Sequence, residues 1–465
     1  MRRTPLSMLA HWAGGSLHGE DVAIDGLSND SRAIVPGSLY LALRGERFDG
    51  HEFAAAAQAA GAAALLVERL LPIELPQLLV DNSEQALARI AAAIQADRRT
   101  EVSAITGSNG KTSVKNLLSA ILGHAAQVQG RQVYATPGNR NNEIGLPLAV
   151  LDAPDDARFA VYEMGAGKPG DIAYLTAIAR PDVALVNNIA PAHLERMGSL
   201  LGVAETKGAI HDALPADGVA VVNADDSFAP SFIERAQGRR VLRFGIDAAA
   251  ELQARDIQLA ANGARFVLAA PTGDIAIALP MPGRHNVRNA LAAAAMAIAV
   301  GASLEQVRAG LEAVQPVAGR LVAHALRSGA VLVDDSYNAN PGSLAAGIDT
   351  LASSGDEAWL VLGDMRELGA GEIALHAQAG QQARAAGIVR LFALGDLSAH
   401  AVAAFGDGAQ AFDSHEALAD ALAADLHAGV RVLVKGSRGS AMDRIVKALL
   451  QRDAAENGGG TTDAA

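Results

Sequence analysis

A glycine-rich segment around a lysine is the part of this sequence best suited to chemistry. Residues 105–113 read Ile-Thr-Gly-Ser-Asn-Gly-Lys-Thr-Ser, between a strand-like apolar run at 101–106 and a helical pattern at 113–122. Such a loop binds phosphate, because backbone N–H groups and a helix N-terminus point at the anion. Lys111 would reach the β- and γ-phosphates, and the Thr112 hydroxyl would bind Mg²⁺. The segment predicts a nucleotide site, with a glycine turn beside a solvated lysine as the alternative.

Three other reactive side chains follow later in the chain. Glu163 closes an apolar run, His193 follows the apolar run at 182–186, and Lys207 lies in a helical pattern. A carboxylate at a strand end opposite a phosphate loop is well placed to bind Mg²⁺. Taken singly, each residue also has an ordinary interpretation: a strand terminus, a hydrogen-bonded loop histidine and an exposed helical lysine.

The composition excludes several other kinds of site. The chain has 465 residues and no cysteine, which excludes disulfide scaffolds, thiolate zinc sites, iron–sulfur clusters and cysteine nucleophiles. Lys and Arg number 38 against 51 Asp and Glu, a formal charge of −13, so we do not expect binding to nucleic acid. An anionic substrate would need local positive groups that act against this overall field.

No segment has the pattern of a signal peptide or a membrane span. The longest apolar runs are rich in alanine and shorter than the roughly 20 residues that a spanning helix needs. We therefore expect a cytoplasmic protein with no membrane span. Nothing in the sequence points to a large exposed interface, so we expect a monomer.

Apolar runs alternate with helical patterns along the chain, which predicts α/β domains. At roughly 100–200 residues per domain, the length predicts about three. We expect domains at 1–99, 100–315 and 316–453, with a hinge at 315–319 and a flexible tail at 454–465.

The expected strands and helices support this division. The first domain has short apolar runs at 38–43, 62–67 and 75–80, with helical patterns at 52–60 and 83–96. In the second domain, the continuous apolar runs are typical of a parallel sheet covered on both faces, and they lie at 101–106, 157–162, 182–186 and 218–222. A helix is expected at 289–300. In the third domain, the runs end in polar or glycine turns, where open α/β sheets bind ligands, and they lie at 330–333, 359–362, 391–394 and 431–434.

The phosphate loop has the short form T-G-x-x-G-K-T, because Ile105 stands where the usual first glycine would be. Together with Glu163, His193 and Lys207, this loop resembles the Mur ligase family. Segments that extend the resemblance over almost the whole chain are 136–145, 283–290, 319–320 and 334–341. The resemblance implies a small N-terminal α/β uridine-nucleotide domain, a central parallel-sheet P-loop ATPase domain and a C-terminal Rossmann-like α/β domain.

The resemblance also implies roles for individual residues. Expected catalytic residues are Lys111, Lys207, His193, Glu163 and Arg320. Expected ATP contacts are Gly107, Ser108, Asn109, Gly110, Lys111, Thr112, Ser113, Asn289, Arg320 and Asp335. Expected Mg²⁺ ligands are Thr112, Glu163, His193 and, if CO₂ carbamylates it, Lys207. Expected substrate contacts are Ser28, Asp30, Ser31, Arg32, Asn139, Asn142, Tyr337 and Asn338. Without these neighbours, Arg320 would be interpreted as a hinge salt bridge and Asp335 as a turn cap. Asn109 stands where serine is also common, and we expect little effect from it.

The first domain resembles that of two members of the family, the ligases that add the third residue or the final dipeptide to the muramoyl peptide. Segments 28–32 and 36–51 look like a uridine-nucleotide domain, which the folylpolyglutamate synthetases lack. The ligase that adds the third amino acid carries an Asp-Asn-Pro-Arg motif, whereas residues 363–369 read Gly-Asp-Met-Arg-Glu-Leu-Gly here. The resemblance therefore implies ATP- and Mg²⁺-dependent addition of D-alanyl-D-alanine to UDP-N-acetylmuramoyl-tripeptide, through an acyl phosphate, in peptidoglycan precursor synthesis. The third-residue ligase is the alternative, and a P-loop nucleotide-binding switch is the alternative from another class. The third residue of the acceptor peptide, diaminopimelate or lysine, stays open.

Overall fold

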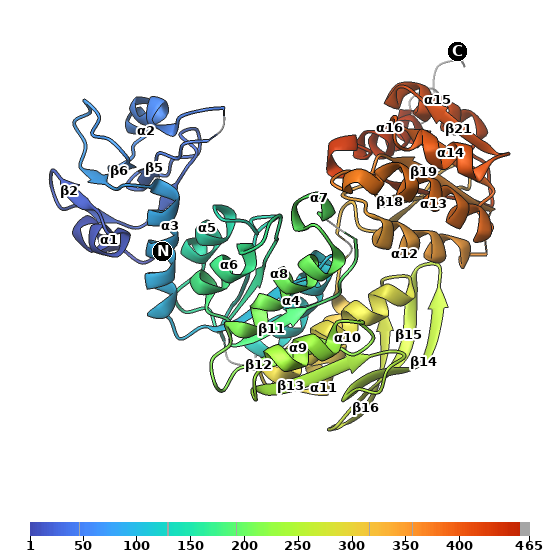
Figure 1. Cartoon of the computed structure of the whole chain (residues 1–465), viewed down its shortest axis with the longest axis horizontal. Coiled ribbons are helices and arrows are strands. Elements are labelled where there is room, and N and C mark those ends of the chain that lie inside the picture. The colour runs from blue at the N-terminus through green and yellow to red at the C-terminus, as the bar shows by residue number, and fades with distance from the viewer. Residues whose placement is uncertain (46, 128–129, 192, 316, 356, 456–465) are drawn as a thin grey trace, which may run out of the picture.

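Three sheets, each built from one continuous part of the chain, organise the computed structural model (Figure 1). The structure describes residues 1–45, 47–127, 130–191, 193–315, 317–355 and 357–455. The sheets contain five, nine and six strands, and helices pack against them. The α/β class and the three-part architecture expected from the sequence are therefore confirmed. In Figure 1 the first unit (blue) and the third (orange to red) flank the second.

The first unit is a small, mostly parallel sheet with strand order β2-β7-β6-β5-β4. Its strands are β2 (Ser16–His18), β4 (Leu27–Ser28), β5 (Leu39–Leu41), β6 (Ala64–Val67) and β7 (Gln77–Leu79), and β1 (Thr4–Pro5) pairs separately with β3 (Ala23–Ile24). Its helices are α1 (Leu6–Ala13), η1 (Gly50–Phe53), α2 (Ala54–Ala59) and α3 (Ser83–Ala96). The Asn82 side chain caps α3 by accepting a hydrogen bond from the Gln85 N–H, so this helix begins at the residue expected from the sequence.

The second unit has a parallel sheet that continues into antiparallel strands. The parallel strands are β8 (Glu101–Thr106), β9 (Val133–Ala135), β10 (Phe159–Glu163), β11 (Val183–Val186), β12 (Val219–Asn223) and β13 (Arg240–Gly245). The next strands are β14 (Leu252–Ala260), β15 (Gly263–Ala270) and β16 (Gly273–Leu279), of which β15 and β16 run antiparallel to their neighbours. Of the parallel strands, β8, β10, β11 and β12 were predicted, whereas β9, β13 and the antiparallel extension were not.

Helices cover both faces of this sheet. They are α4 (Lys111–Gln127), α5 (Gly145–Asp152), α6 (Asp171–Ala179), α7 (Leu194–Met197), α8 (Leu200–Asp212), α9 (Ala229–Arg235), α10 (Arg284–Ala299) and α11 (Leu304–Ala313). Helix α10 begins five residues before the predicted start at 289, because Gly283 occupies its N-cap and residues 284–288 already belong to the first turns. Helices α4, α10 and α11 pack together on one face, so the helix that follows the phosphate loop is held by two neighbours.

The third unit is a six-stranded sheet with order β17-β18-β22-β19-β20-β21, parallel except for β17. Its strands are β17 (Val322–Ala325), β18 (Val331–Asp335), β19 (Glu357–Gly363), β20 (Arg390–Leu394), β21 (Ala409–Phe412) and β22 (Val430–Lys435). Its helices are α12 (Pro341–Ala352), η2 (Gly369–Gly371), α13 (Glu372–Ala385), α14 (Ala399–Phe405), α15 (His415–Asp425), η3 (Arg438–Ser440) and α16 (Asp443–Ala455).

The predicted hinge and tail lie partly outside the described residues. Pro316 of the hinge and residues 456–465 of the tail are not described. Residues 454–455 belong to α16, so this helix continues two residues beyond the boundary drawn from the sequence. Among the described residues, no helix is long and apolar enough to cross a membrane.

The crossing of α4 and α11 provides a test of this packing. A Cβ atom on Gly310 of α11 would stand 2.4 Å from the Ile121 Cα atom of α4, whereas one on Gly123 of α4 would meet nothing within 4 Å. We expect Gly310→Ala to lower the free energy of unfolding by about 1–3 kcal/mol through overpacking. We expect Gly123→Ala to raise it by about 0.5–1 kcal/mol through helix propensity. Urea unfolding of both variants measures the difference, and equal effects would contradict this close crossing.

Candidate active site

A cavity of about 700 Å³ lies between the phosphate loop, the carboxyl ends of β10 and β11, and the third unit. Its described wall carries seven Lys and Arg residues against four Asp and Glu residues, in a chain whose overall charge is −13. Sixteen of the predicted site residues line it: Ser108, Asn109, Gly110, Lys111, Thr112, Ser113, Asn139, Asn142, Glu163, His193, Lys207, Asn289, Arg320, Asp335, Tyr337 and Asn338. The size and the excess of positive groups suit a large anionic ligand.

The phosphate loop turns sharply into α4. Gly110 has a φ of 78°, and a Cβ atom there would stand 2.5 Å from the Asn289 Oδ1 atom and 2.6 Å from the Asn187 Nδ2 atom, so no side chain fits. Lys111 is the first residue of α4 and bends back to donate a hydrogen bond of 2.8 Å to the Gly107 carbonyl. The loop thus places a helix N-terminus and an ammonium beside the same space, the arrangement that binds phosphate elsewhere.

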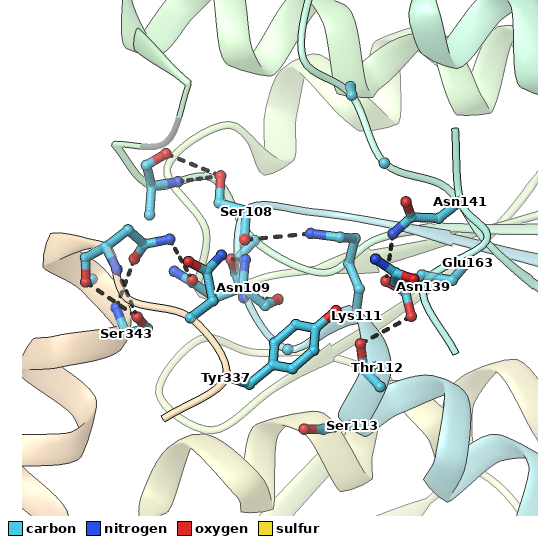
Figure 2. A pocket seen from close by; sticks show the side chains of 18 of the residues that line it. Ser108, Asn109, Lys111, Thr112, Ser113, Asn139, Asn141, Glu163, Tyr337 and Ser343 are labelled. Carbon is cyan, nitrogen blue, oxygen red and sulfur yellow. Dashed lines mark hydrogen bonds between the residues drawn. The ribbon is translucent and has the colours of Figure 1, made fainter. Parts of the chain in front are cut away.

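The Glu163 carboxylate ends β10 and is 3% exposed. Figure 2 shows it accepting hydrogen bonds from the Thr112 hydroxyl (3.0 Å) and the Asn141 amide (2.9 Å). Burial alone would raise its pKa, but the charges of Lys111 and Lys115 and these two hydrogen bonds outweigh burial and hold the pKa below its usual value. Glu163 is therefore an ionised carboxylate beside the Thr112 hydroxyl, and it is not a solvated strand terminus.

Lys207 lies on α8 and faces the cavity, with only 1% of the residue exposed. Burial and, less strongly, the nearby Lys111 charge together lower the pKa of its ammonium to about 7, although Asp171 opposes the shift. No side chain in the described part of the chain forms an ion pair with it. The interpretation as an exposed helical lysine is therefore wrong, and the side chain is a partly neutral amine facing the cavity at neutral pH.

His193 lies in the loop after β11 with a φ of 54°, and its Nδ1 atom is 2.5 Å from a carboxylate oxygen of Glu367. Burial lowers the pKa of His193, and Glu367 opposes the shift. Within the described residues, no group of three or more His, Asp and Glu side chains is arranged to hold a metal ion. Glu163, His193 and Lys207 therefore share one cavity without forming a metal cage made of protein ligands alone.

The third unit brings several side chains to the same cavity. The Arg320 guanidinium lies over the Tyr337 ring, 4.2 Å from its centroid, and no described acidic residue pairs with it. Asp335 is buried and paired with Lys435, 2.5 Å away, while turn capping belongs to its neighbour Asp334, which accepts from the Gly319 and Ser336 N–H groups. Neither the hinge salt bridge nor the turn cap expected as alternatives is formed by these two residues.

Asn109 contacts the third unit directly. Its Oδ1 atom accepts a 2.7 Å hydrogen bond from the side chain of Asn340, which also caps α12 (Figure 2). Its main chain is held by Asn187 and Asn188. The prediction that this residue matters little overlooked a hydrogen bond between the phosphate loop and another domain.

The predicted uridine-nucleotide residues lie apart from this cavity. Ser28 ends β4, and Asp30, Ser31 and Arg32 follow it in the first unit. The exposed Arg32 guanidinium donates to both Asp30 carboxylate oxygens, and this hydrogen bonding lowers the pKa of Asp30 to about 2. The structure thus separates these four residues from the cavity.

Several residues at the cavity were not among the predicted site residues. Asn141, Asn340 and Lys435 line the cavity, whereas Lys115, Asn187 and Glu367 lie behind its wall and contact residues that line it. Lys115 had a local signal, because it lies four residues after Lys111 and must share its helix face. Glu367, Asn340 and Lys435 acquire their partners through contacts between distant parts of the chain, which no local pattern reveals.

Replacement of Lys207 tests its burial. Because its pKa falls from 10.5 to about 7 on folding, the unfolded chain binds more protons between these values, so wild-type stability rises with pH across this window. We expect Lys207→Met to unfold at a higher temperature than the wild type at pH 7. The difference in free energy of unfolding between Lys207→Met and the wild type should shrink by about 2 kcal/mol between pH 7 and pH 9. Thermal unfolding in CO₂-free buffer measures this, with the exposed Lys447→Met as the control, and a gain independent of pH would contradict the lowered pKa.

The chain is similar to known proteins along almost its whole length. Residues 23–122 match the Mur ligase family catalytic domain, residues 105–297 the Mur ligase middle domain, and residues 319–438 the Mur ligase glutamate ligase domain. The chain is 43% identical over 447 residues to the UDP-N-acetylmuramoyl-tripeptide–D-alanyl-D-alanine ligase of Escherichia coli K12, covering 96% of this chain and 98% of that one.

Solved structures agree with these matches. MurF from Acinetobacter baumannii superposes with a TM-score of 0.91 at 31% identity, covering 97% of this chain and 99% of that one. MurF ligase from Thermotoga maritima, solved in complex with ADP, superposes with a TM-score of 0.82 at 27% identity, covering 93% and 98%. With a phosphate loop, a buried carboxylate and a third unit around one cavity, and with these matches along its length, the chain belongs to the Mur ligase family.

Proposed function

We propose that this protein is the ATP-dependent ligase that joins D-alanyl-D-alanine to UDP-N-acetylmuramoyl-tripeptide in peptidoglycan precursor synthesis. The observation that carries the proposal is the 43% identity to a ligase of that name over 96% of the chain. The cavity adds chemical support, because it places a phosphate loop, an ionised carboxylate and the Arg320 guanidinium of the third unit around one space.

The reaction requires activation of a carboxylate, which is a poor electrophile. The carboxylate of the tripeptide attacks the γ-phosphorus of ATP, ADP leaves, and an acyl phosphate forms. The free amine of the dipeptide then attacks the acyl carbon, loses a proton, and expels phosphate as the amide bond forms. Lys111 and the N-terminus of α4 stabilise the charge on the phosphates, and Arg320 contributes a second cation from the third unit.

The residues present suit Mg²⁺. The Thr112 hydroxyl and the Glu163 carboxylate are oxygen ligands 3.0 Å apart, and Glu163 is ionised. Mg²⁺ in proteins commonly takes one or two carboxylates together with substrate phosphates, so a larger protein cage is not needed. Thr112, Glu163, His193 and a carbamylated Lys207 would hold it. When bound, Mg²⁺ supplies positive charge that neutralises the transferring phosphoryl group.

The three units divide the substrates between them. We assign the uridine diphosphate to the first unit, around Ser28, Asp30, Ser31 and Arg32. We assign ATP to the phosphate loop of the second unit, where Asn289 lies beside Gly110. Arg320 and Asp335 of the third unit would contact the same nucleotide. The reacting carboxylate would lie near Asn139 and Asn142, and the dipeptide near Tyr337 and Asn338 of the third unit.

Release of ADP tests the proposed activity. We expect ADP only when ATP, Mg²⁺, UDP-N-acetylmuramoyl-tripeptide and D-alanyl-D-alanine are all present, and Lys111→Ala should reduce the rate about 10²- to 10³-fold. The exposed Lys447→Met should match the wild type. Release that ignores the dipeptide but needs a free amino acid with UDP-muramoyl-dipeptide would indicate the third-residue ligase. Slow release that ignores both muramoyl substrates would indicate a nucleotide switch.

Lys207 is proposed to carry a carbamate. A neutral amine adds CO₂ and releases a proton, and the low pKa of Lys207 provides neutral amine at physiological pH. Here the product replaces a buried cation with an anion beside the metal and the triphosphate. We expect native mass spectra in bicarbonate buffer to show a CO₂ adduct that Lys207→Ala lacks, together with loss of ADP release in that variant. An unmodified wild type and full activity in Lys207→Ala would disprove the carbamate.

A further inference from the structure

A second lysine of α4 has no part in the chemistry described so far. Lys115 lies one helical turn after Lys111, so the two side chains share a face of the helix. The residue is 4% exposed, although lysine is almost never fully buried without partners. Its burial therefore has to be explained by what its ammonium holds.

Three partners surround that ammonium. The Nζ atom donates hydrogen bonds of 2.9 Å to the carbonyl oxygens of Thr136 and Gly138, and lies 3.4 Å from the Glu163 Oε2 atom. The two carbonyl groups each accept one of the three ammonium protons, and the Glu163 carboxylate balances the charge. Lys115 also does not belong to the cavity wall formed by the described residues. It is thus placed to hold protein groups, and not to bind substrate.

The two carbonyl groups belong to the turn that leads from β9 to α5. This turn carries Asn139, Asn141 and Asn142, and all three line the cavity. Asn141 donates to Glu163, and its carbonyl oxygen accepts a hydrogen bond from the Gly165 N–H. Thr136 is also hydrogen-bonded to β10, whereas residues 137–140 are exposed. Among the described residues, Lys115 ties the first half of the turn to α4 through its hydrogen bonds to the carbonyl groups of Thr136 and Gly138.

We propose that Lys115 is a positioning residue that fixes the 136–142 turn and Glu163 relative to the phosphate loop. The inference rests on the proposed function, in which the acceptor carboxylate near this turn must reach the γ-phosphate above α4. Both reacting groups are then located from one helix: the phosphates by its first residue, the acceptor turn by its fifth. A displacement of about 1 Å between reacting groups can cost about 10²-fold in rate, so this attachment controls turnover.

Three variants and a control test the proposal. Lys115→Met removes every hydrogen bond, Lys115→Gln keeps donors without charge, and Lys115→Arg keeps charge and donors in a larger planar group. Lys447→Met, on the exposed surface of α16, is the matched lysine control. The measurements are thermal unfolding, ADP affinity by calorimetry, and steady-state ADP release with each substrate varied.

We expect Lys115→Met to lower kcat about 10²-fold and to raise the KM for UDP-N-acetylmuramoyl-tripeptide several-fold. ADP affinity should stay within about threefold of the wild type, because the phosphate loop is untouched. Lys115→Arg should recover about a tenth of the wild-type kcat, and Lys115→Gln should fall between Arg and Met. A merely structural lysine would instead lower the unfolding temperature and leave the kinetic constants of the folded fraction unchanged.

Each contrary result is decisive. Wild-type kcat and acceptor KM in a folded Lys115→Met would overturn the proposal, and so would a loss of ADP affinity that matches the loss of kcat. If Lys115→Met does not fold, Lys115→Arg decides, because full kcat with the larger group would show that the turn position is unimportant. If the wild type itself fails to release ADP with the two substrates, the proposed function is wrong. The proposal for Lys115 then falls with it, whereas an active wild type beside an unaffected Lys115→Met overturns the proposal for Lys115 alone.

Discussion

Burial of a single ionised carboxylate sets the geometry at the centre of this molecule. Glu163 would cost several kcal/mol to bury without compensation, and four groups compensate it: Lys111, Lys115, Thr112 and Asn141. Three of these come from the first five residues of α4, and the fourth comes from the turn after β9. The end of β10, the start of α4 and the turn can therefore move little relative to one another without exposing an unpaired charge. The packing of α4 against α10 and α11 transmits the same constraint to the rest of the second unit.

The cavity gathers positive charge in a protein that is negatively charged overall. The chain is acidic overall, yet the described cavity wall has more basic than acidic side chains. Burial lowers the pKa of both Lys111 and Lys207, and a neighbouring cation lowers each further: Arg320 acts on Lys111, and Lys111 acts on Lys207. Cations gathered in a buried space without matching anions destabilise the folded protein, a cost usually found at functional sites. When a polyphosphate ligand binds, its negative charge attracts these cations, so that the same cluster becomes favourable. Under the proposed function, binding of ATP thus relieves a repulsion that the sequence maintains in the free protein.

Local patterns predicted the elements that frame the site. The strand ending at Thr106, the helix beginning near Lys111 and the capped helix at Ser83–Ala96 depend on residues within a few positions of one another. Strands β9 and β13 to β16 were missed, although Asn262-Gly263, at the turn from β14 into β15, is a strong hairpin signal. Side-chain contacts were harder to predict from the sequence, because the partners lie far apart in the chain. Thr112 and Glu163 are 51 residues apart, and Asp335 and Lys435 are 100 residues apart. Which partner each residue finds depends on strand order, and a single sequence does not reveal it.

The third unit is tied to the phosphate loop by its own contacts. Asn340 reaches Asn109 over a separation of 231 residues, and Glu367 reaches His193 from the loop that follows β19. A Cβ atom on Gly342 would stand 3.1 Å from both Ala190 and the Asn109 side chain, so the start of α12 already lies against the loops of the second unit. These contacts help to hold the third unit where Arg320 and Asp335 line the cavity. The same loop that would grip the phosphates is therefore bonded to the domain that completes the cavity, and a ligand that reshapes the loop must also act on the position of that domain.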